Sequence, residues 1–421
     1  MRRTEAKVTA RRSRRRFGLV VGIVVVVALG LYVPASLLAP APASAGVATT
    51  YTAPSQAATS VDLPSYGGSA IEAVGYKGSL VTHDPSTPRS IASISKIVTA
   101  LVVLQKKPLN GGNGPTITIT PTEQAYYKTY LAQDGEVATM TVGQKLTERQ
   151  VLEVALIKSA NNYATTLAIW AYGSIPAYRA AAATWLKQHA LDHTTINEPT
   201  GLDFKNKSTP TDLLTLGRLA LANTDVATIV STAETTVPGV GEIENSNGLL
   251  GKDGVVGIKT GTLDKVGANL LFATKQEVDG HEVELIGVVL GGPDHDTIDT
   301  AIGRMLAQVT AKFHVVTAVS KGAVYGTYAT PWGATARAAT TRSASKLVYG
   351  TATVSAHVKL DHVAVRGAGA HVGTIRVTIG SSTTTVPLAL DGPIEAPSAW
   401  WRLTNPRATF GGAEAAVAER F

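Results

Sequence analysis

Ser93 and Lys96 are the residues of this sequence with the clearest capacity for chemistry. They stand three apart in Ser93-Ile94-Ser95-Lys96, and two residues three apart on a helix share a face, so their side chains can touch. A serine hydroxyl becomes a good nucleophile when a base accepts its proton, and a lysine serves as that base when burial or nearby positive charge lowers its pKa. The pair therefore indicates a serine nucleophile with a lysine base.

The spacing by itself is not specific, because Ser-x-x-Lys recurs in this chain at Ser343 and Lys346. Such a motif arises about once by chance in a chain of this size. The second copy lies in a β-rich region, where residues three apart point to opposite faces of a sheet. We therefore interpret only the first copy as chemical.

Two further motifs follow Ser93 in chain order. Ser159-Ala160-Asn161 falls at a break between two predicted helices, where short polar side chains can project into a cleft. Lys259-Thr260-Gly261-Thr262 falls on a predicted strand, and the missing side chain of Gly261 leaves room for a substrate backbone. All three motifs in this order coincide by chance in about one chain in a hundred. The sequence thus predicts one site built from three distant segments.

Helices are expected to position the first two motifs. An unbroken apolar segment predicts a helix over 94–105, whose first turn would carry the serine and the lysine. Thr147 and Gln150 form a capping-box pattern that starts a second helix, which runs to about residue 158. A third helix is expected over 162–172 and would stop at Gly173.

The third motif belongs to a predicted sheet. Alternating runs predict successive antiparallel strands over 255–262, 268–274 and 283–290. Beyond about residue 313, Val, Thr and Ala alternate as in further strands. We therefore expect an α/β (α+β) fold. Its parts are a domain with an antiparallel sheet flanked by helices over 61–313, a smaller all-β domain over 314–405 and a tail over 406–421.

The N-terminus is typical of an export segment. Residues 1–16 hold seven arginines and one lysine against one glutamate, and an apolar run over 17–33 follows. The small residues of Ala43-Ser44-Ala45 suit signal peptidase cleavage before Gly46. The apolar run also approaches the roughly 20 residues of a membrane span, so residues 1–45 are either a signal peptide or a membrane anchor. Residues 46–60, rich in Ala, Ser and Thr, predict a flexible linker.

Composition argues against several other classes. The basic N-terminus accounts for the whole net charge of +7, so the rest of the chain is neutral and a nucleic-acid-binding function loses its main support. The absence of cysteine excludes disulfides and cysteine zinc sites. Neither Gly-x-Ser-x-Gly nor His-Glu-x-x-His occurs, and Asp294-His295-Asp296, without partner ligands at suitable spacing, is typical of a solvated loop. We expect no metal and no cofactor.

Together the three motifs resemble those of the low-molecular-mass penicillin-binding proteins, the D-alanyl-D-alanine carboxypeptidases. That family has the β-lactamase/transpeptidase-like fold, and the resemblance covers about residues 65–310. The segments that carry it are 92–100, 159–162, 199–203, 208–213, 245–247 and 259–261. The chain departs from the pattern at Ala160, where the family motif has Asp. It also lacks the arginine that many relatives carry after the Lys-Thr-Gly strand, since the next arginine beyond 292–296 is Arg304.

The resemblance implies an exported serine-type D-Ala-D-Ala carboxypeptidase that acts on the stem peptide of peptidoglycan. Ser93 would attack the carbonyl between the two terminal D-alanines, and Lys96 would accept its proton. Ser159 would relay a proton to the leaving amine with Lys259 nearby, and Asn161 would help to hold the base and the substrate amide.

The strand motif would bind the end of the substrate. Thr260 and Thr262 would hold the terminal carboxylate beside Gly261, and the backbone N–H groups of Ser93 and Thr262 would form an oxyanion hole. The resemblance also implies that β-lactam antibiotics acylate Ser93. The protein would work outside the cytoplasm, either held at the membrane through an uncleaved N-terminal segment or released to the cell wall.

Two alternatives stay open. The same fold could serve a β-lactamase or a D-amino-peptide esterase, which rapid turnover of β-lactams would favour. A non-catalytic protein that binds the cell wall could also retain the scaffold, although the intact serines and lysines argue against it. Penicillin labelling that depends on Ser93 separates these alternatives.

Overall fold

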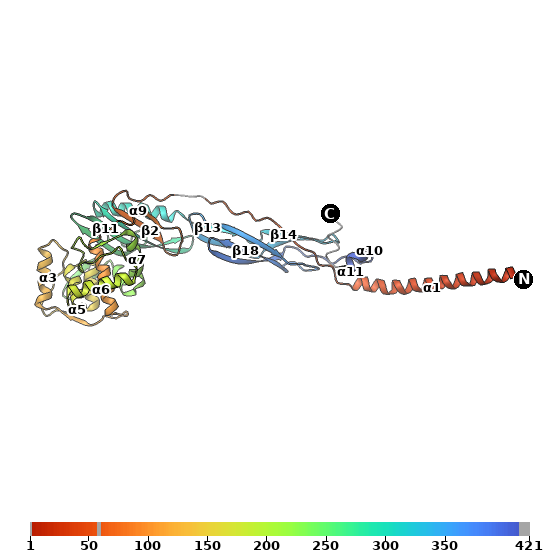
Figure 1. The fold of residues 1–421 in the computed structure, drawn as a ribbon, viewed down its shortest axis with the longest axis horizontal. Coiled ribbons are helices and arrows are strands. Elements are labelled where there is room, and N and C mark those ends of the chain that lie inside the picture. Colours follow the sequence, from red (N-terminus) through yellow and green to blue (C-terminus); the bar gives the residue numbers. More distant parts are fainter. Residues whose placement is uncertain (1, 57–59, 412–421) are drawn as a thin grey trace. The chain divides into compact units, whose positions relative to one another are not determined.

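The computed structural model describes residues 2–56 and 60–411, and Figure 1 shows the order of the elements along the chain. The chain forms two compact units. We call the first, made of Ala57–His314 and Leu347–Thr351, the central unit. We call the second, made of Met1–Gln56, Val315–Lys346 and Ala352–Phe421, the terminal unit, because it unites both ends of the chain. Each is described by itself.

A five-stranded antiparallel sheet forms the middle layer of the central unit. Its strand order is β10-β11-β12-β2-β3, and its strands are β10 (Val255–Leu263), β11 (Gly267–Val278), β12 (His281–Gly292), β2 (Gly68–Ala73) and β3 (Val81–His83). The three strands that the sequence predicts correspond to β10, β11 and β12, and their antiparallel order is confirmed.

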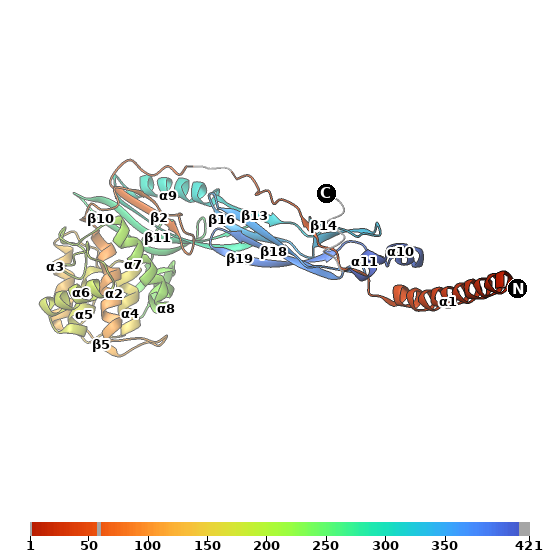
Figure 2. The ribbon, with the colours of Figure 1, turned by 45° about the vertical axis from the view of Figure 1, so that its right-hand side comes forward.

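Helices cover both faces of this sheet, as Figure 2 shows. Alternation along β11 explains why, since Leu271 packs into the core on one face while Leu270 and Phe272 pack into the core on the other. The first core contains helices α2 (Ser95–Lys106), α4 (Glu148–Leu156), α5 (Asn161–Tyr172), α6 (Ile175–Gln188), α7 (Pro210–Ala222) and α8 (Thr224–Val230). The second core contains α9 (His295–Thr310). The sheet is therefore apolar on both sides.

Local signals define the helices that carry the site. The Thr147 side chain accepts a hydrogen bond from the backbone N–H of Gln150, and the Gln150 side chain accepts one from the backbone N–H of Thr147, so the predicted capping box of α4 is confirmed. Gly173 ends α5 with φ 84°, a conformation that glycine adopts without a Cβ penalty. The predicted helix over 94–105 corresponds to α2, preceded by a 3₁₀ turn, η1 (Ala92–Ile94).

Shorter elements complete the central unit. They are helix α3 (Pro121–Leu131) and the strand pairs β4 (Arg89–Ser90) with β7 (Lys207–Ser208), β5 (Thr116–Thr118) with β6 (Lys145–Thr147), and β8 (Glu234–Val237) with β9 (Gly241–Glu244). The β4–β7 pair ends just before η1 and so ties the start of the nucleophile turn to a distant part of the chain.

A six-stranded sheet dominates the terminal unit, with strand order β1-β14-β15-β19-β18-β17. These strands are β1 (Val47–Ala48), β14 (Val324–Ala329), β15 (Thr335–Thr340), β19 (Ser382–Leu390), β18 (His371–Ile379) and β17 (Val354–Leu360). Strands β13 (Phe313–Val319) and β16 (Ala344–Tyr349) pair with each other, and residues 313–314 and 347–349 of these strands are counted with the central unit. Three helices also belong here, α1 (Arg2–Leu38), α10 (Ala399–Thr404) and α11 (Pro406–Phe410).

In the second Ser-x-x-Lys copy, the serine and the lysine are not hydrogen-bonded to each other. The hydroxyl of Ser343 accepts a hydrogen bond from the backbone N–H of Lys321. The ammonium of Lys346 instead donates to the hydroxyl of Ser382. The serine and the lysine of this copy therefore face different partners, as expected of residues three apart at a β-strand.

The segment predicted as a flexible linker differs from that prediction at its start. Val47 and Ala48 pair with Thr327 and Gly326 as strand β1. Further along, the Gln56 side chain exchanges hydrogen bonds of 2.7 and 2.8 Å with the backbone of Ala352. Backbone pairing needs no apolar pattern, which is why an Ala-, Ser- and Thr-rich segment can form it without a signal in the sequence.

Candidate active site

Ser93 lies in the η1 turn that leads into α2, and Lys96 lies in the first turn of that helix. The Nζ atom of Lys96 is 2.7 Å from the Oγ atom of Ser93 and 2.7 Å from the carbonyl oxygen of Thr200, to which it donates. Ala92 precedes the serine with φ 46°, a conformation that costs energy in a residue other than glycine. The predicted contact between the two motif residues is present.

Burial makes Lys96 a base. Its side chain is 1% exposed, and burial lowers its pKa well below the ordinary value of a lysine, with the positive charge of Lys259 acting in the same direction. The carboxylates of Glu198 and Glu136 oppose this shift. A lysine that loses its proton so readily can accept one from the serine hydroxyl beside it.

Lys259, on β10, is the second buried lysine of the site. Burial lowers its pKa to about 7, while Glu136 acts in the opposite direction. Its Nζ atom lies 3.4 Å from the hydroxyl oxygens of both Ser246 and Thr260, and those two oxygens are 2.5 Å apart. A mobile proton can therefore be shared among a lysine and two hydroxyl groups at this end of the site.

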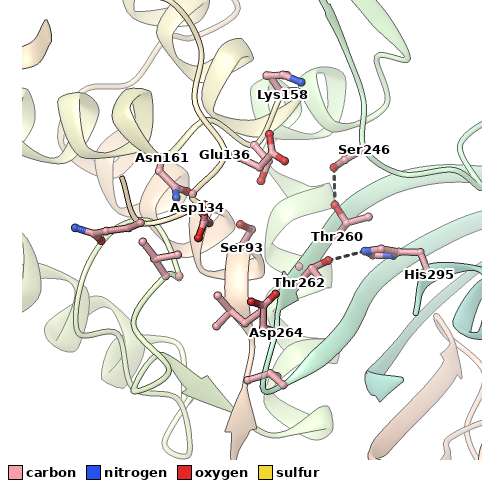
Figure 3. A pocket seen from close by; sticks show the side chains of 18 of the residues that line it. Ser93, Asp134, Glu136, Lys158, Asn161, Ser246, Thr260, Thr262, Asp264 and His295 are labelled. Atoms are coloured by element: carbon pink, nitrogen blue, oxygen red, sulfur yellow. Dashed lines mark hydrogen bonds between the residues drawn. The ribbon is translucent and has the colours of Figure 1, made fainter. Parts of the chain in front are cut away.

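A cavity of about 710 Å³ opens over the two lysines, and Figure 3 shows side chains that line it. Six of the eight predicted site residues line it, namely Ser93, Ser159, Asn161, Thr260, Gly261 and Thr262. The other two, Lys96 and Lys259, are buried. The structure thus brings three segments far apart in sequence to one cavity.

Ser159 and Asn161 line the cavity without hydrogen bonds to the nucleophile. Ser159 lies between α4 and α5 with φ 62°, and the backbone N–H of Asn161 donates to the carbonyl oxygen of Glu136 at 2.7 Å. Within residues 15–56 and 60–411, no hydrogen bond joins either side chain to Ser93 or Lys96. Both side chains are therefore available to a substrate.

Gly261 has a packing role beside the one that the sequence suggests for it. A Cβ at this position would lie 2.7 Å from the carbonyl oxygen of Ile91 and 3.0 Å from the backbone nitrogen of Ser93. On the side of a Cβ, Gly261 thus lies against the nucleophile turn, while the residue also lines the cavity. Glycine allows β10 and η1 to pack backbone to backbone, which fixes the serine against the strand.

A loop that the sequence analysis did not include in the site holds Lys96 in place. The carboxylate of Glu198 accepts hydrogen bonds from the backbone N–H groups of Thr200 at 2.7 Å and Gly201 at 2.6 Å. This arrangement fixes the carbonyl oxygen of Thr200 to which Lys96 donates. Residues 199–203 carry part of the family resemblance, and Glu198 directly before them holds this loop in place.

Ser246 and His295 also line the cavity and were not among the predicted site residues. The Nε2 atom of His295, the first residue of α9, is 2.7 Å from the hydroxyl oxygen of Thr262 (Figure 3). The sequence predicts a solvated loop for Asp294-His295-Asp296, because no partner ligands stand at a suitable spacing. Its position follows from the sheet, in which β12 ends beside the start of β11.

Comparisons with known proteins agree with this geometry. The peptidase S11 family, described as D-alanyl-D-alanine carboxypeptidase, matches residues 75–294. A D-alanyl-D-alanine carboxypeptidase of Streptomyces sp. strain K15 is 33% identical, over 46% of this chain and 71% of the relative. A D-alanyl-D-alanine endopeptidase of Escherichia coli K12 is 29% identical, over 46% of this chain and 62% of its own length.

Solved structures extend the likeness. The Streptomyces K15 DD-transpeptidase has a TM-score of 0.51 and 28% identity, over 61% of this chain and 98% of that one. DacD, a D-alanyl-D-alanine carboxypeptidase from Francisella tularensis, has a TM-score of 0.54 and 19% identity, over 83% of this chain and 97% of that one. At that identity the second likeness shows the fold alone, and it reaches beyond the central unit.

Proposed function

Because this chain belongs to the D-alanyl-D-alanine carboxypeptidase family of serine peptidases, we propose that it removes the terminal D-alanine from peptidoglycan stem pentapeptides through an acyl-enzyme on Ser93. The observation that carries the proposal is the 2.7 Å contact between the Ser93 hydroxyl and the buried amine of Lys96 at the floor of the cavity. This contact supplies the nucleophile and the base of an acyl transfer.

Acylation begins with the transfer of the Ser93 proton to neutral Lys96, while the serine oxygen bonds to the carbonyl carbon between the two D-alanines. The negative charge that develops on the carbonyl oxygen is held by the backbone N–H groups of Ser93 and Thr262. The C–N bond then breaks, and the leaving amine of D-alanine takes up a proton. The product is an ester of the shortened peptide on Ser93.

Ser159 and Lys259 supply the proton path to the leaving amine. Ser159 lines the cavity, and Lys259, with a pKa of about 7, can hold or release a proton at neutral pH. Asn161 lines the same wall and can bind the amide of the substrate. Water then attacks the ester, with Lys96 as the base, and frees the peptide.

The terminal carboxylate of the substrate binds at the end of β10. Thr260, Thr262 and His295 offer hydroxyl and imidazole donors at this end of the cavity. His295 contributes here in place of the arginine that the sequence lacks. A β-lactam enters the same site and leaves Ser93 as a slowly hydrolysed ester.

The protein works outside the cytoplasm, and α1 carries it to the membrane. Its segment Arg15–Leu38 is 24 residues long and contains an 18-residue stretch with a mean hydropathy of 2.5, which is long and apolar enough to cross a bilayer. The Arg-rich start of the chain favours a cytoplasmic N-terminus. The rest of the chain would then lie on the outer side, where peptidoglycan is found.

Incubation with a stem pentapeptide tests the proposal. We expect release of D-alanine by wild type and none by Ser93→Ala, with fluorescent penicillin labelling of wild type only. Labelling without D-alanine release would indicate that cross-linked peptides are the substrate, and endopeptidase assays would then decide. Absence of labelling in both proteins would exclude the acyl-enzyme mechanism.

A further inference from the structure

The C-terminal end of helix α1 packs against α10 and α11 within the terminal unit. The hydroxyl of Tyr32 donates to the carbonyl oxygen of Leu403 at 2.7 Å, and its ring lies 6.4 Å from the ring of Phe410. The guanidinium of Arg402 donates to the carbonyl oxygen of Ala39, just beyond the helix end. The predicted export segment is thus held to α10 and α11 by hydrogen bonds and an aromatic contact.

The peptide around the predicted cleavage site is also part of the fold. Ser44 is buried, and its backbone exchanges hydrogen bonds of 2.8 and 3.0 Å with Val363. Ser36, one helical turn beyond Tyr32 and on the same face, is fully buried. Cleavage before Gly46 would remove all of these contacts. The terminal unit is therefore built with the residues that a signal peptidase would discard.

The contacts fix a depth for α10 and α11 relative to the span. Counted from Phe17, the roughly 20 residues that cross the hydrocarbon core end near Ser36. Tyr32 lies four residues before Ser36, which is about 6 Å along the helix axis from that end of the core. Residues bonded to Tyr32 therefore lie at the level where hydrocarbon meets headgroups, the zone in which Tyr and Trp are enriched in membrane proteins.

The composition of α10 and α11 suits that zone. Trp400 is 75% exposed and Phe410 is 54% exposed, so two large apolar side chains face outward beside the helix. The segment 399–410 contains Arg402 and Arg407 but no acidic residue, and such basic and aromatic character favours the surface of a bilayer with anionic lipids. The neighbouring Trp401 packs instead against Trp332, at 5.8 Å between ring centroids.

We propose that the N-terminal segment is retained and that α10 and α11, packed against the outer end of α1, bind the bilayer surface. We call these two helices the collar. Trp400 and Phe410 of the collar insert into the bilayer interface. The inference rests on the export proposed above. It adds a lipid-binding surface, and it makes residues 32–44 a structural part of the terminal unit rather than a removable leader.

The N-terminus of the mature protein is the first test. Full-length protein is purified from the membranes of expressing cells, and its mass is measured. We expect a mass that includes α1. A chain that begins at Gly46 overturns the inference. Penicillin labelling of the same sample reports the catalytic proposal separately, so a shortened chain that still labels overturns only the present inference.

Quenching of tryptophan fluorescence tests the collar. Full-length protein is reconstituted into vesicles of neutral and anionic lipids with bromines placed near the headgroup or near the bilayer centre. We expect stronger quenching by the shallow bromines, and Trp400→Phe should lose a large part of it. Trp185→Phe, which removes a tryptophan buried in the central unit, should lose none. Equal quenching of wild type and Trp400→Phe overturns the collar, provided that both proteins label with penicillin.

Discussion

The Nε2 atom of His295 lies 2.7 Å from the hydroxyl oxygen of Thr262. This contact joins the first residue of α9 to the end of β10. Both residues line the cavity. The contact places an imidazole at the end of the site where the proposed substrate has its carboxylate, although the sequence offers no arginine there.

We expect His295→Leu to weaken the binding of peptides that end in a free carboxylate. The KM for such a peptide should rise about tenfold or more, since a hydrogen bond to a charged group contributes about 1.5–3 kcal/mol. His295→Arg should retain binding. Steady-state kinetics on the acid and on the matching C-terminal amide measure the effect, and an equal change for both substrates would contradict this role.

Lys96 should be required for acylation. We expect Lys96→Met to slow penicillin labelling of Ser93 by about 10²–10⁴-fold, the range of a general base, because no other group lies within hydrogen-bond distance of the Ser93 hydroxyl in the described part of the chain. The matched control is Lys346→Met in the second Ser-x-x-Lys copy, which should label at the wild-type rate. Equal effects of the two substitutions would refute the assignment.

The buried lysines should make the protein more stable as the pH rises. Lys259 has a pKa of about 7 in the fold and 10.5 as a free side chain, so between these values the unfolded chain binds a proton that the folded chain does not. The free energy of unfolding then increases with pH. Lys259→Met should reduce the increase in the free energy of unfolding between pH 7 and pH 9 by as much as a few kcal/mol. Urea unfolding at the two pH values measures this difference. An unchanged slope would contradict the low pKa.

Glu148 should have the opposite effect. It is fully buried, its two carboxylate oxygens have no hydrogen-bond partner among the described residues, and burial raises its pKa from 4.5 to about 7. Between these values the folded chain binds the extra proton, so the free energy of unfolding falls as the pH rises.

In wild type, Glu148 should lower the free energy of unfolding by on the order of 1 kcal/mol or more between pH 5 and pH 7. The substitution Glu148→Gln should abolish this decrease without loss of penicillin labelling. Urea unfolding of both proteins at the two pH values measures it. A fall of the same size in the variant would show that other groups cause it.

Gly261→Ala should destabilise the nucleophile turn. The added Cβ would lie 2.7 Å from the carbonyl oxygen of Ile91, which belongs to rigid backbone. We expect slower labelling of Ser93 and a loss of stability of about 1–3 kcal/mol, the usual cost of overpacking.

Gly303→Ala provides the control for that substitution. Gly303 lies inside α9 with open space around its Cβ position, so alanine there should raise stability by about 0.5–1 kcal/mol. Thermal unfolding and labelling rates compare the two variants. A Gly261→Ala protein that labels at the wild-type rate would show that the close packing of β10 against η1 is not needed.

The sequence by itself determined the parts of the site. Helix α2, the capping box at Thr147, the glycine end of α5 and the three strands from β10 to β12 all follow from local periodicity and turn chemistry. The motif residues are identified as site residues because three short patterns in a fixed order rarely coincide by chance. Lys346 is excluded as a catalytic base because residues three apart on a β-strand point to opposite faces.

Only the tertiary structure decided how these parts work together. The pKa of Lys96 depends on burial and on Lys259, which is 163 positions further along the chain. His295 reaches Thr262 through the order of strands in the sheet, and Gly261 packs closely against η1. Burial, close backbone approach and charge proximity arise from segments that meet only after folding, so no local pattern records them.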